Sequence, residues 1–388
     1  MLNPAPLLPA DALLPVYAQM PVRPVRGRGS WLIDEDGERW LDAYGGHAVA
    51  STGHCHPEVV AAIANQAAEL LFYSTALAHP NRELLAAALA ARCPAPLNKV
   101  FFCNSGAEAN ENAMHLARKV TGRAGIVSIA GGWHGRTVAT LAVTDGEHYY
   151  KAAERAGMPL ARKVPFNDLK TASAVIDAST AAVIVEPVQG MAGARDCDPE
   201  FLSALRRACD EHGALLIFDE VQCGVGRCGT FTAAESFDVT PDVLTMAKGL
   251  ASGMPIAALV TSARVAEKVK VGDLGSTFGG GPVPCAAALA TLAVIEREGL
   301  LANVREVSAR LTAGALALGR DKVQAVQGRG LLLGLRLARP AAEVQKALFA
   351  QRVLVGTSAD PAVLRLLPPL SFSAAEADLL LAALGRVL

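Results

Sequence analysis

The sequence predicts an α/β fold: a mostly parallel central sheet in a large domain, and a smaller α+β domain formed by both ends of the chain. From about residue 98, short apolar segments alternate with helical ones, a pattern typical of parallel strands covered by helices on both faces. The terminal segments have a different pattern, and 388 residues exceed one ordinary domain. We therefore expect the large domain at residues 46–282 and the small one at residues 1–45 plus 283–388.

The central segment supplies the sheet and its covering helices. Strands are expected at residues 99–103, 125–129, 181–185, 214–218 and 243–246, and helices at residues 108–120 and 201–212. In the first helix the apolar residues recur every three or four positions and share one face. Residues 278–295 carry no charge, but their initial glycines and prolines predict a turn and then a buried, alanine-rich helix, not a membrane span.

The N-terminal part predicts a β-hairpin at residues 29–42, around Asp36-Gly37, a pair that tolerates the positive φ of a tight turn. Before it, MLNPAPLLPAD has neither a basic region nor a cleavage site after an apolar run. We therefore expect no secretory signal and a cytoplasmic protein.

The C-terminal part predicts helix, strand, turn, helix and strand in succession. One strand is expected at residues 324–337, around Gly328-Arg329-Gly330, and another at residues 363–370. Ser373 and Glu376 have the spacing of a capping box at the start of the last helix. These elements would join the N-terminal hairpin in the second domain.

The composition and net charge of the chain indicate which kinds of molecule it can bind. Hydrophobic residues make up 52% of the chain and charged residues 19%, with a mean hydropathy of +0.30, which excludes a disordered chain. The 36 Lys+Arg against 37 Asp+Glu give a net charge of −1, so nucleic acid is disfavoured and small molecules are expected. The 8 Cys form no C-x-x-C pair, which indicates reduced and mostly buried thiols; four of them precede or interrupt apolar runs, namely Cys103, Cys209, Cys223 and Cys285.

Two charged residues follow apolar strands of the predicted sheet. Asp219 ends the strand in LLIFDEVQCGVGR, where ligands of α/β sheets bind, although a cap for the following turn is an equal alternative. Lys248 follows the strand in TMAKG. If its amine is buried, burial lowers the pKa of that amine. The alternative is a surface lysine whose aliphatic stem is buried and whose amine reaches solvent. Together they match the lysine and acid that pyridoxal phosphate requires.

A phosphate site is expected at NSGAEANENA. Asn104 to Ala107 lie between a strand and a helix, and the free N–H groups of a helix start attract anions. The alternative is simple helix capping, because Glu108 and Glu111 also suit the helix dipole.

Further motifs extend this pattern along most of the chain. In order they are LPVY (14–17), GHCHP (53–57), FFCNSGAEANE (101–111), WHGRT (133–137), VIVEPVQG (183–190), LLIFDEVQCGVGR (215–227), PDVLTMAKG (241–249), GSTFGG (275–280) and VLRLLPPL (363–370). With them the chain resembles the class III (ω-amino acid) aminotransferases of pyridoxal-phosphate fold type I, and most of all the acetylornithine and succinylornithine group. The resemblance implies transfer of the terminal amine of an N-acylated ornithine to 2-oxoglutarate, giving a semialdehyde and glutamate, in a homodimer with shared sites.

The resemblance also implies roles around the cofactor. Lys248 would form the Schiff base and shuttle the proton, and Asp219 would hold the pyridinium N–H. Gln222 would bind the phenolate oxygen, with Val221 and Trp133 against the two ring faces. The remaining cofactor contacts would be Ser105, Gly106 and Ala107 at the phosphate, Thr277 at the phosphate of the neighbouring subunit, and Glu186.

On the substrate side, Arg365 would bind a carboxylate, because bidentate Arg–carboxylate geometry suits it. Arg136 would be a second carboxylate contact, supported by Glu186. Tyr17 and Ser276 would also contact the substrate.

Two positions depart from the family pattern. Met191, in EPVQGMAGA, stands where a glutamate pairs with the arginine at the Arg365 position. Arg365 would then always require a substrate carboxylate, so free ornithine or GABA should be poor substrates. His47 stands where relatives carry Ile or Tyr; it is either a packed or solvent-facing residue, or a contact for a substrate acyl or carboxylate group.

Other functions are weighed against this one. Within the family, the alternatives are a carrier-protein-linked lysine or another ω-amino acid as donor, and outside it a catalytically idle protein of the same fold. A dinucleotide-dependent oxidoreductase is the alternative from another class, because GVGRCG (224–229) matches a dinucleotide motif. No helical pattern follows this motif, however, and no acid stands about 20 residues on. His54-Cys55-His56 lacks further metal ligands, and Pro57 predicts a helix entry instead, so no metal is expected.

Overall fold

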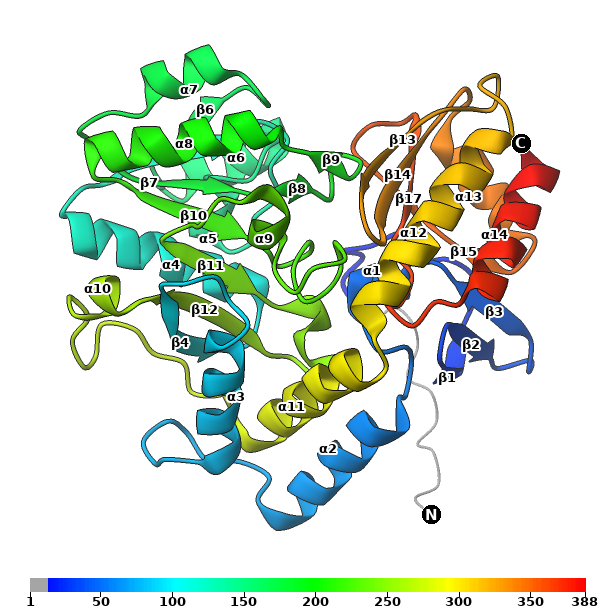
Figure 1. The fold of residues 1–388 in the computed structure, drawn as a ribbon, viewed down its shortest axis with the longest axis horizontal. Helices are drawn as coiled ribbons and strands as arrows, with labels where there is room; N and C mark the ends of the chain where they lie inside the picture. Colours follow the sequence, from blue (N-terminus) through cyan, green and yellow to red (C-terminus); the bar gives the residue numbers. More distant parts are fainter. Residues whose placement is uncertain (1–12) are drawn as a thin grey trace.

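The computed structural model describes residues 13–388, so the N-terminal segment expected to carry no secretory signal lies outside it. Its largest sheet has seven strands in the order β4-β12-β11-β10-β7-β5-β6 (Figure 1). Neighbouring strands are parallel except β12, which is antiparallel to both β11 and β4. The strands are β4 (Leu97–Cys103), β5 (Gly125–Ile129), β6 (Arg162–Val164), β7 (Thr180–Val185), β10 (Leu215–Asp219), β11 (Val243–Met246) and β12 (Ala257–Ser262).

Helices cover both faces of this sheet because successive strand residues point to opposite sides. Val183 packs in one apolar cluster with Leu202 of α8, whereas the next residue, Ile184, packs in another with Met114 of α4. The helices of this part are α4 (Gly106–Thr121), α5 (Val138–Leu141), α6 (Glu147–Arg155), α7 (Leu169–Val175), α8 (Pro199–His212), α9 (Ala233–Phe237), α10 (Ala263–Ala266) and the 3₁₀ helix Lys248–Ala251. A separate two-stranded ribbon consists of β8 (Val188–Gln189) and β9 (Arg195–Asp196), and β9 contacts β13 of a smaller sheet.

Two smaller sheets lie beside the large one (Figure 1). One has the order β1-β2-β3-β15 and the other β13-β14-β17-β16. Because β15 pairs in parallel with β3, the first sheet joins both ends of the chain. The strands are β1 (Pro24–Arg28), β2 (Trp31–Asp34), β3 (Arg39–Asp42), β13 (Val323–Arg329), β14 (Leu332–Leu337), β15 (Val353–Leu354), β16 (Gly356–Thr357) and β17 (Val363–Leu366).

The remaining helices connect and cover these sheets. Helix α11 packs against α2 and α3 and leads into α12, which packs against α14. Their bounds are α1 (Gly45–Ala48), α2 (Pro57–Glu69), α3 (Pro80–Ala90), α11 (Pro282–Arg297), α12 (Leu300–Ala317), α13 (Ala341–Phe349) and α14 (Ala374–Val387). The domain boundaries at residues 45/46 and 282/283 stay a prediction.

Most expected elements form, including the hairpin β2–β3 and the capping box of Ser373 and Glu376. The single strand at 324–337 is wrong: β13 ends at Arg329, and Gly330 turns the chain with φ +55 into the antiparallel β14. A side chain there would come within 2.4 Å of a backbone oxygen of Arg227. The strand at 363–370 is too long, because β17 ends at Leu366, ahead of two prolines that cannot donate to a ladder. Strand β12 was not expected.

Three minor expectations can also be compared with the structure. Residues 224–229 form turns, and helix α9 begins only at Ala233. His56 caps α2, accepting a hydrogen bond from the N–H of Glu58, as a helix entry requires. No helix within residues 13–388 is long and apolar enough to cross a membrane.

Candidate active site

The predicted lysine and carboxylate of the site lie at the carboxyl edge of the large sheet. Asp219 is the last residue of β10, and Lys248 follows the neighbouring parallel strand β11. They line a cavity of about 330 Å³ together with Ser105, Gly106, Ala107, Trp133 and Val221. A second cavity of about 360 Å³ shares Lys248, Asp219, Trp133 and Val221 and adds Tyr17, Tyr44, His47, Arg136, Glu186, Met191, Gln222 and Arg365.

Lys248 has an unusual backbone and an unusual charge environment. Its φ is +44°, a left-handed conformation that costs energy for a side chain with a Cβ and is found preferentially at functional sites. Burial lowers the pKa of its amine, and the negative charges of Asp219 and Glu186 only partly oppose that effect. A lysine amine with a lowered pKa is the form that reacts with a carbonyl group.

Asp219 is fixed by three hydrogen bonds and is only 2% exposed. Its Oδ2 accepts a hydrogen bond from the Asn110 amide at 2.7 Å and lies 2.8 Å from Nδ1 of His134. Its Oδ1 accepts the N–H of Val221 at 3.0 Å, so the expected turn cap is present as well. Asn110 is held in turn by the hydroxyl of Thr245, at 2.7 Å. The carboxylate is therefore oriented at the cavity wall, where it can receive a proton donor.

The anion site was expected at the start of α4. Ser105 is its N-cap, and the Ser105 hydroxyl accepts the N–H of Glu108 at 3.2 Å. Gly106 is needed here because a Cβ would lie 2.6 Å from the Val221 side chain. The N–H groups of this first turn, with the helix dipole, suit a phosphate.

Glu186 supports the tryptophan loop. Its carboxylate accepts the N–H of Trp133 at 2.6 Å and that of Gly190 at 3.2 Å. Burial, together with the negative charge of the nearby Asp219, raises the pKa of this carboxyl to about 7. Arg136 lies instead over the rings of Tyr17 and Trp133, at 5.0 and 5.3 Å from their centroids. The expectation that Glu186 supports Arg136 is thus not met, because backbone N–H groups take up the carboxylate.

Arg365 is buried on β17, with three neutral acceptors. Its Nε donates to the Thr357 carbonyl at 2.7 Å, its Nη1 to the Gly190 carbonyl at 3.2 Å and its Nη2 to the Tyr44 hydroxyl at 2.7 Å. None of the ion pairs within residues 13–388 involves it. Met191 lines the same cavity. The guanidinium charge therefore has no carboxylate partner in the described chain.

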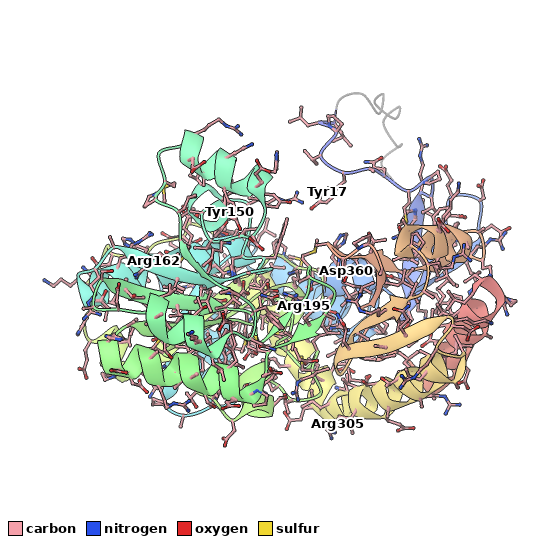
Figure 2. The ribbon with its side chains drawn as sticks, turned by 90° about the horizontal axis from the view of Figure 1, so that it is seen from above. Tyr17, Tyr150, Arg162, Arg195, Arg305 and Asp360 are labelled. Atoms are coloured by element: carbon pink, nitrogen blue, oxygen red, sulfur yellow. The ribbon has the colours of Figure 1, made fainter. Side chains whose placement is uncertain are left out.

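A wider cavity of about 860 Å³ opens beyond Arg365 and includes Tyr17, His47 and Met191. Figure 2 shows Tyr17 on the N-terminal segment above the junction of the two parts of the molecule, with Asp360 at that junction. His47 faces this space with its ring 4.8 Å from that of Tyr44. Burial and then the charge of Arg365 lower the pKa of His47, which favours the neutral imidazole.

Two expected site residues lie apart from these cavities. The Ser276 hydroxyl accepts the amide of Asn104 at 3.0 Å and the N–H of Gly279 at 3.2 Å. Thr277 is exposed, next to the exposed Phe278. Neither lines the three cavities described above.

Comparison with known proteins identifies this arrangement. Residues 14–388 match the family described as aminotransferase class-III. The chain belongs to this family. The class-III aminotransferase is 43% identical over 380 residues to acetylornithine aminotransferase 1 of Bordetella bronchiseptica, covering 95% of both chains. It is 42% identical over 375 residues to the acetylornithine aminotransferase of Methanopyrus kandleri, covering 96% of this chain and 95% of that protein.

Solved structures share the fold. The ornithine aminotransferase of Toxoplasma gondii superposes with a TM-score of 0.90 at 28% identity, covering 97% of this chain and 92% of that one. Another structure of that enzyme has pyridoxal phosphate at partial occupancy in its active site. The class-III aminotransferase described here is therefore a pyridoxal-phosphate-dependent enzyme, and the predictions of its fold class, cofactor and reaction class are confirmed.

The cavity fits this cofactor by its own chemistry. It combines a lysine amine, a carboxylate for a ring N–H and an anion site, as the pyridine ring and its phosphate require. Two buried polar atoms beside it, Nε2 of His134 and Oε1 of Gln222, have no hydrogen-bond partner within the described residues. Buried groups of this kind normally have partners, so their lack of one indicates room for a polar ligand.

Sequence reasoning missed three residues of the site. Asn110 and His134 lie inside recognised motifs, and their proximity to Asp219 becomes visible only when α4 and the tryptophan loop are packed. Tyr44 was not considered at all. Its only signal was its position directly after the hairpin, next to the glycines that precede His47.

Proposed function

We propose that this aminotransferase takes the terminal amine of N-acetylornithine or N-succinylornithine and transfers it to 2-oxoglutarate, giving the semialdehyde and glutamate. The single observation that carries the proposal is 43% identity over 95% of the chain to a protein named acetylornithine aminotransferase. The buried, unpaired Arg365 supports it, since both proposed substrates carry carboxylates.

When bound, pyridoxal phosphate supplies an electron sink for the negative charge that develops on the substrate carbon. Lys248 would take the proton from that carbon and return it, because its amine lies in the cavity with a lowered pKa. Asp219 would keep the ring nitrogen protonated. Val221 and Trp133 would hold the ring from both sides, and Gln222 would bind its oxygen substituent.

The phosphate would rest on Ser105, Gly106 and Ala107. A larger residue at Gly106 would clash with the side chain of Val221, which is proposed to hold one face of the ring. Substrate carboxylates would be bound by Arg365 and Arg136, which both line the second cavity. Tyr17 and His47 line the wider cavity, whose 860 Å³ gives space for an acyl chain.

The visible absorption spectrum of the holoenzyme tests the proposal. Adding N-acetylornithine should bleach the band of the bound cofactor, and adding 2-oxoglutarate should restore it. A band that ignores both acylated ornithines but responds to another ω-amine, such as a carrier-protein-linked lysine, would keep the family and reject the substrate.

We expect Met191→Glu to change the choice of amine. A carboxylate 4 Å from Arg365 would interact with it by about 4 kcal/mol at an effective dielectric of 20, before screening by solvent. It would neutralise Arg365 and admit an uncharged or cationic part of the substrate. The ratio of kcat/KM for free ornithine to that for acetylornithine should therefore rise at least about tenfold.

Met191→Gln is the matched control, since it has a similar length and no charge. If Met191→Glu leaves the ornithine-to-acetylornithine ratio at the value of the Gln control, the idea that Met191 governs Arg365 is wrong.

The proposed assembly is a homodimer with shared sites, working in the cytoplasm. Exposed apolar side chains gather near Thr277: the rings of Phe72 and Phe278 lie 4.9 Å apart, and Leu71 and Leu77 are also exposed. Such a patch supports burial against a second copy. Sedimentation should give a mass of about twice 40.3 kDa.

A further inference from the structure

Tyr44 has no role in the site as proposed so far, yet its hydroxyl contacts the buried Arg365. The Nη2 of Arg365 donates to it at 2.7 Å, and the guanidinium carbon lies 5.5 Å from the centroid of the Tyr44 ring. Tyr44 lines both the second cavity and the wider one. The Tyr44 hydroxyl thus contacts the buried guanidinium of Arg365 and belongs to a side chain that lines the space for a substrate.

The ring of Tyr44 is held on several sides. The backbone N–H groups of Tyr44 and Gly45 both donate to Oδ1 of Asp42, at 2.9 and 2.8 Å, which fixes the chain after β3. The ring of His47 lies edge-on to it. Gly356 packs so closely that a Cβ would come 2.0 Å from the Tyr44 ring. The orientation of the phenol is therefore set by the fold.

Gly356 lies against the Tyr44 ring and is also the strand neighbour of Arg365. In the small sheet, β16 and β17 are antiparallel, and Gly356 pairs directly with Arg365. One strand pair thus supplies both the gap that admits the Tyr44 ring and the guanidinium that its hydroxyl contacts. The geometry would be lost with a larger residue at position 356.

Arg365 and Tyr44 have hydrogen-bond donors without an acceptor in the described chain. The guanidinium has five N–H groups, and within residues 13–388 it has three acceptors, through Nε, Nη1 and Nη2. The Tyr44 hydroxyl accepts from Arg365, and its own proton has no acceptor in the described chain. Burial raises the pKa of the Tyr44 phenol above its usual value, so that proton stays in place at neutral pH.

We propose that Tyr44 and Arg365 together bind a substrate carboxylate. Its oxygens accept hydrogen bonds from the free N–H groups of the guanidinium and from the O–H of the phenol. Tyr44 is thus a specificity-determining residue: a neutral donor that leaves the arginine charge uncompensated and adds a hydrogen bond only when a carboxylate arrives. The assignment deepens the proposed function and rests on it for the identity of the substrates.

The test is Tyr44→Phe in the holoenzyme, with glutarate as an unreactive dicarboxylate probe. A lost hydrogen bond to a charged group should weaken glutarate binding, measured by calorimetry, about tenfold or more. The KM for 2-oxoglutarate should rise by a similar factor while kcat changes little. An aldehyde amino acceptor without a carboxylate should be used as well as by the wild type.

Tyr150→Phe is the matched control, because that phenol lies on α6 under the ammonium of Lys163, away from Arg365. Gly356→Ala is a second variant, which displaces the Tyr44 ring and should also weaken glutarate binding. If Tyr44→Phe binds glutarate as tightly as the Tyr150→Phe control, or if use of the aldehyde falls with that of the keto acid, the assignment is wrong. Glutarate binding that depends on Tyr44, without any turnover of acylated ornithine, would support the assignment and reject only the proposed substrate.

Discussion

Lys248→Ala should lower kcat by about 10⁴-fold or more, because it removes both the amine that bonds to the cofactor and the group that moves the proton. Few side chains in the cavity can replace it. Arg365 stays protonated, and Glu186 is engaged by two backbone N–H groups. The residual rate should then come from binding and orientation alone. Stopped-flow measurement of the amine half-reaction gives the change directly.

A chemical label separates this role from a structural one. Borohydride reduction of the holoenzyme, followed by peptide mass spectrometry, should find the cofactor on Lys248 in the wild type and on no lysine in Lys248→Ala. Lys268→Ala, an exposed lysine whose Nζ donates to the Val120 carbonyl, is the control and should keep full activity. Turnover of Lys248→Ala above about 1% of the wild-type rate, or a label on another lysine, would assign the chemistry elsewhere.

The position of Lys248 beside Asp219 could be predicted because it follows from local pattern. Each residue ends or follows an apolar segment, and the carboxyl ends of neighbouring parallel strands meet at one edge. The strain at Lys248 could not be predicted, since nothing in TMAKG announces a positive φ. Lys248 begins a 3₁₀ helix that a distant segment holds in place, because the Ser51 hydroxyl donates to the Gly249 carbonyl at 2.6 Å.

Contacts between segments far apart in the chain could not be predicted from the sequence. Tyr44 and Arg365 are 321 positions apart, and they meet only because the loop after β3 packs on the β16–β17 strand pair. Glu186 was placed near the correct neighbours but given the wrong partner, because the sequence does not show which backbone N–H groups are left free. The single strand expected at 324–337 was wrong because Gly328-Arg329-Gly330 was placed inside it, whereas Gly330 turns the chain into β14.

Asp219→Asn should lower kcat/KM by about 10³-fold. A carboxylate and a ring N–H⁺ about 4 Å apart interact by about 4 kcal/mol at an effective dielectric of 20, and each 1.36 kcal/mol is a factor of ten in rate. Without the negative charge the ring nitrogen loses its proton and with it the capacity to accept electrons from the substrate carbon. The surrounding donors add to the effect. Val221 and Asn110 each donate to one oxygen of the Asp219 carboxylate. In the asparagine variant one of these two donors would face an NH₂ group in place of an oxygen.

The design must separate charge from stability. Asp242→Asn is the matched control: this carboxylate pairs with Arg206 and Arg264 next to the opposite end of β11, so its loss should lower the melting temperature without changing kcat/KM. The visible band of Asp219→Asn should shift with pH where that of the wild type does not, because the ring nitrogen then titrates without its counter-ion. A variant that keeps wild-type kcat/KM, or whose band shows the same pH response as the control, would leave Asp219 as a turn cap alone. The hydrogen bond that it already accepts from Val221 would then be its whole function.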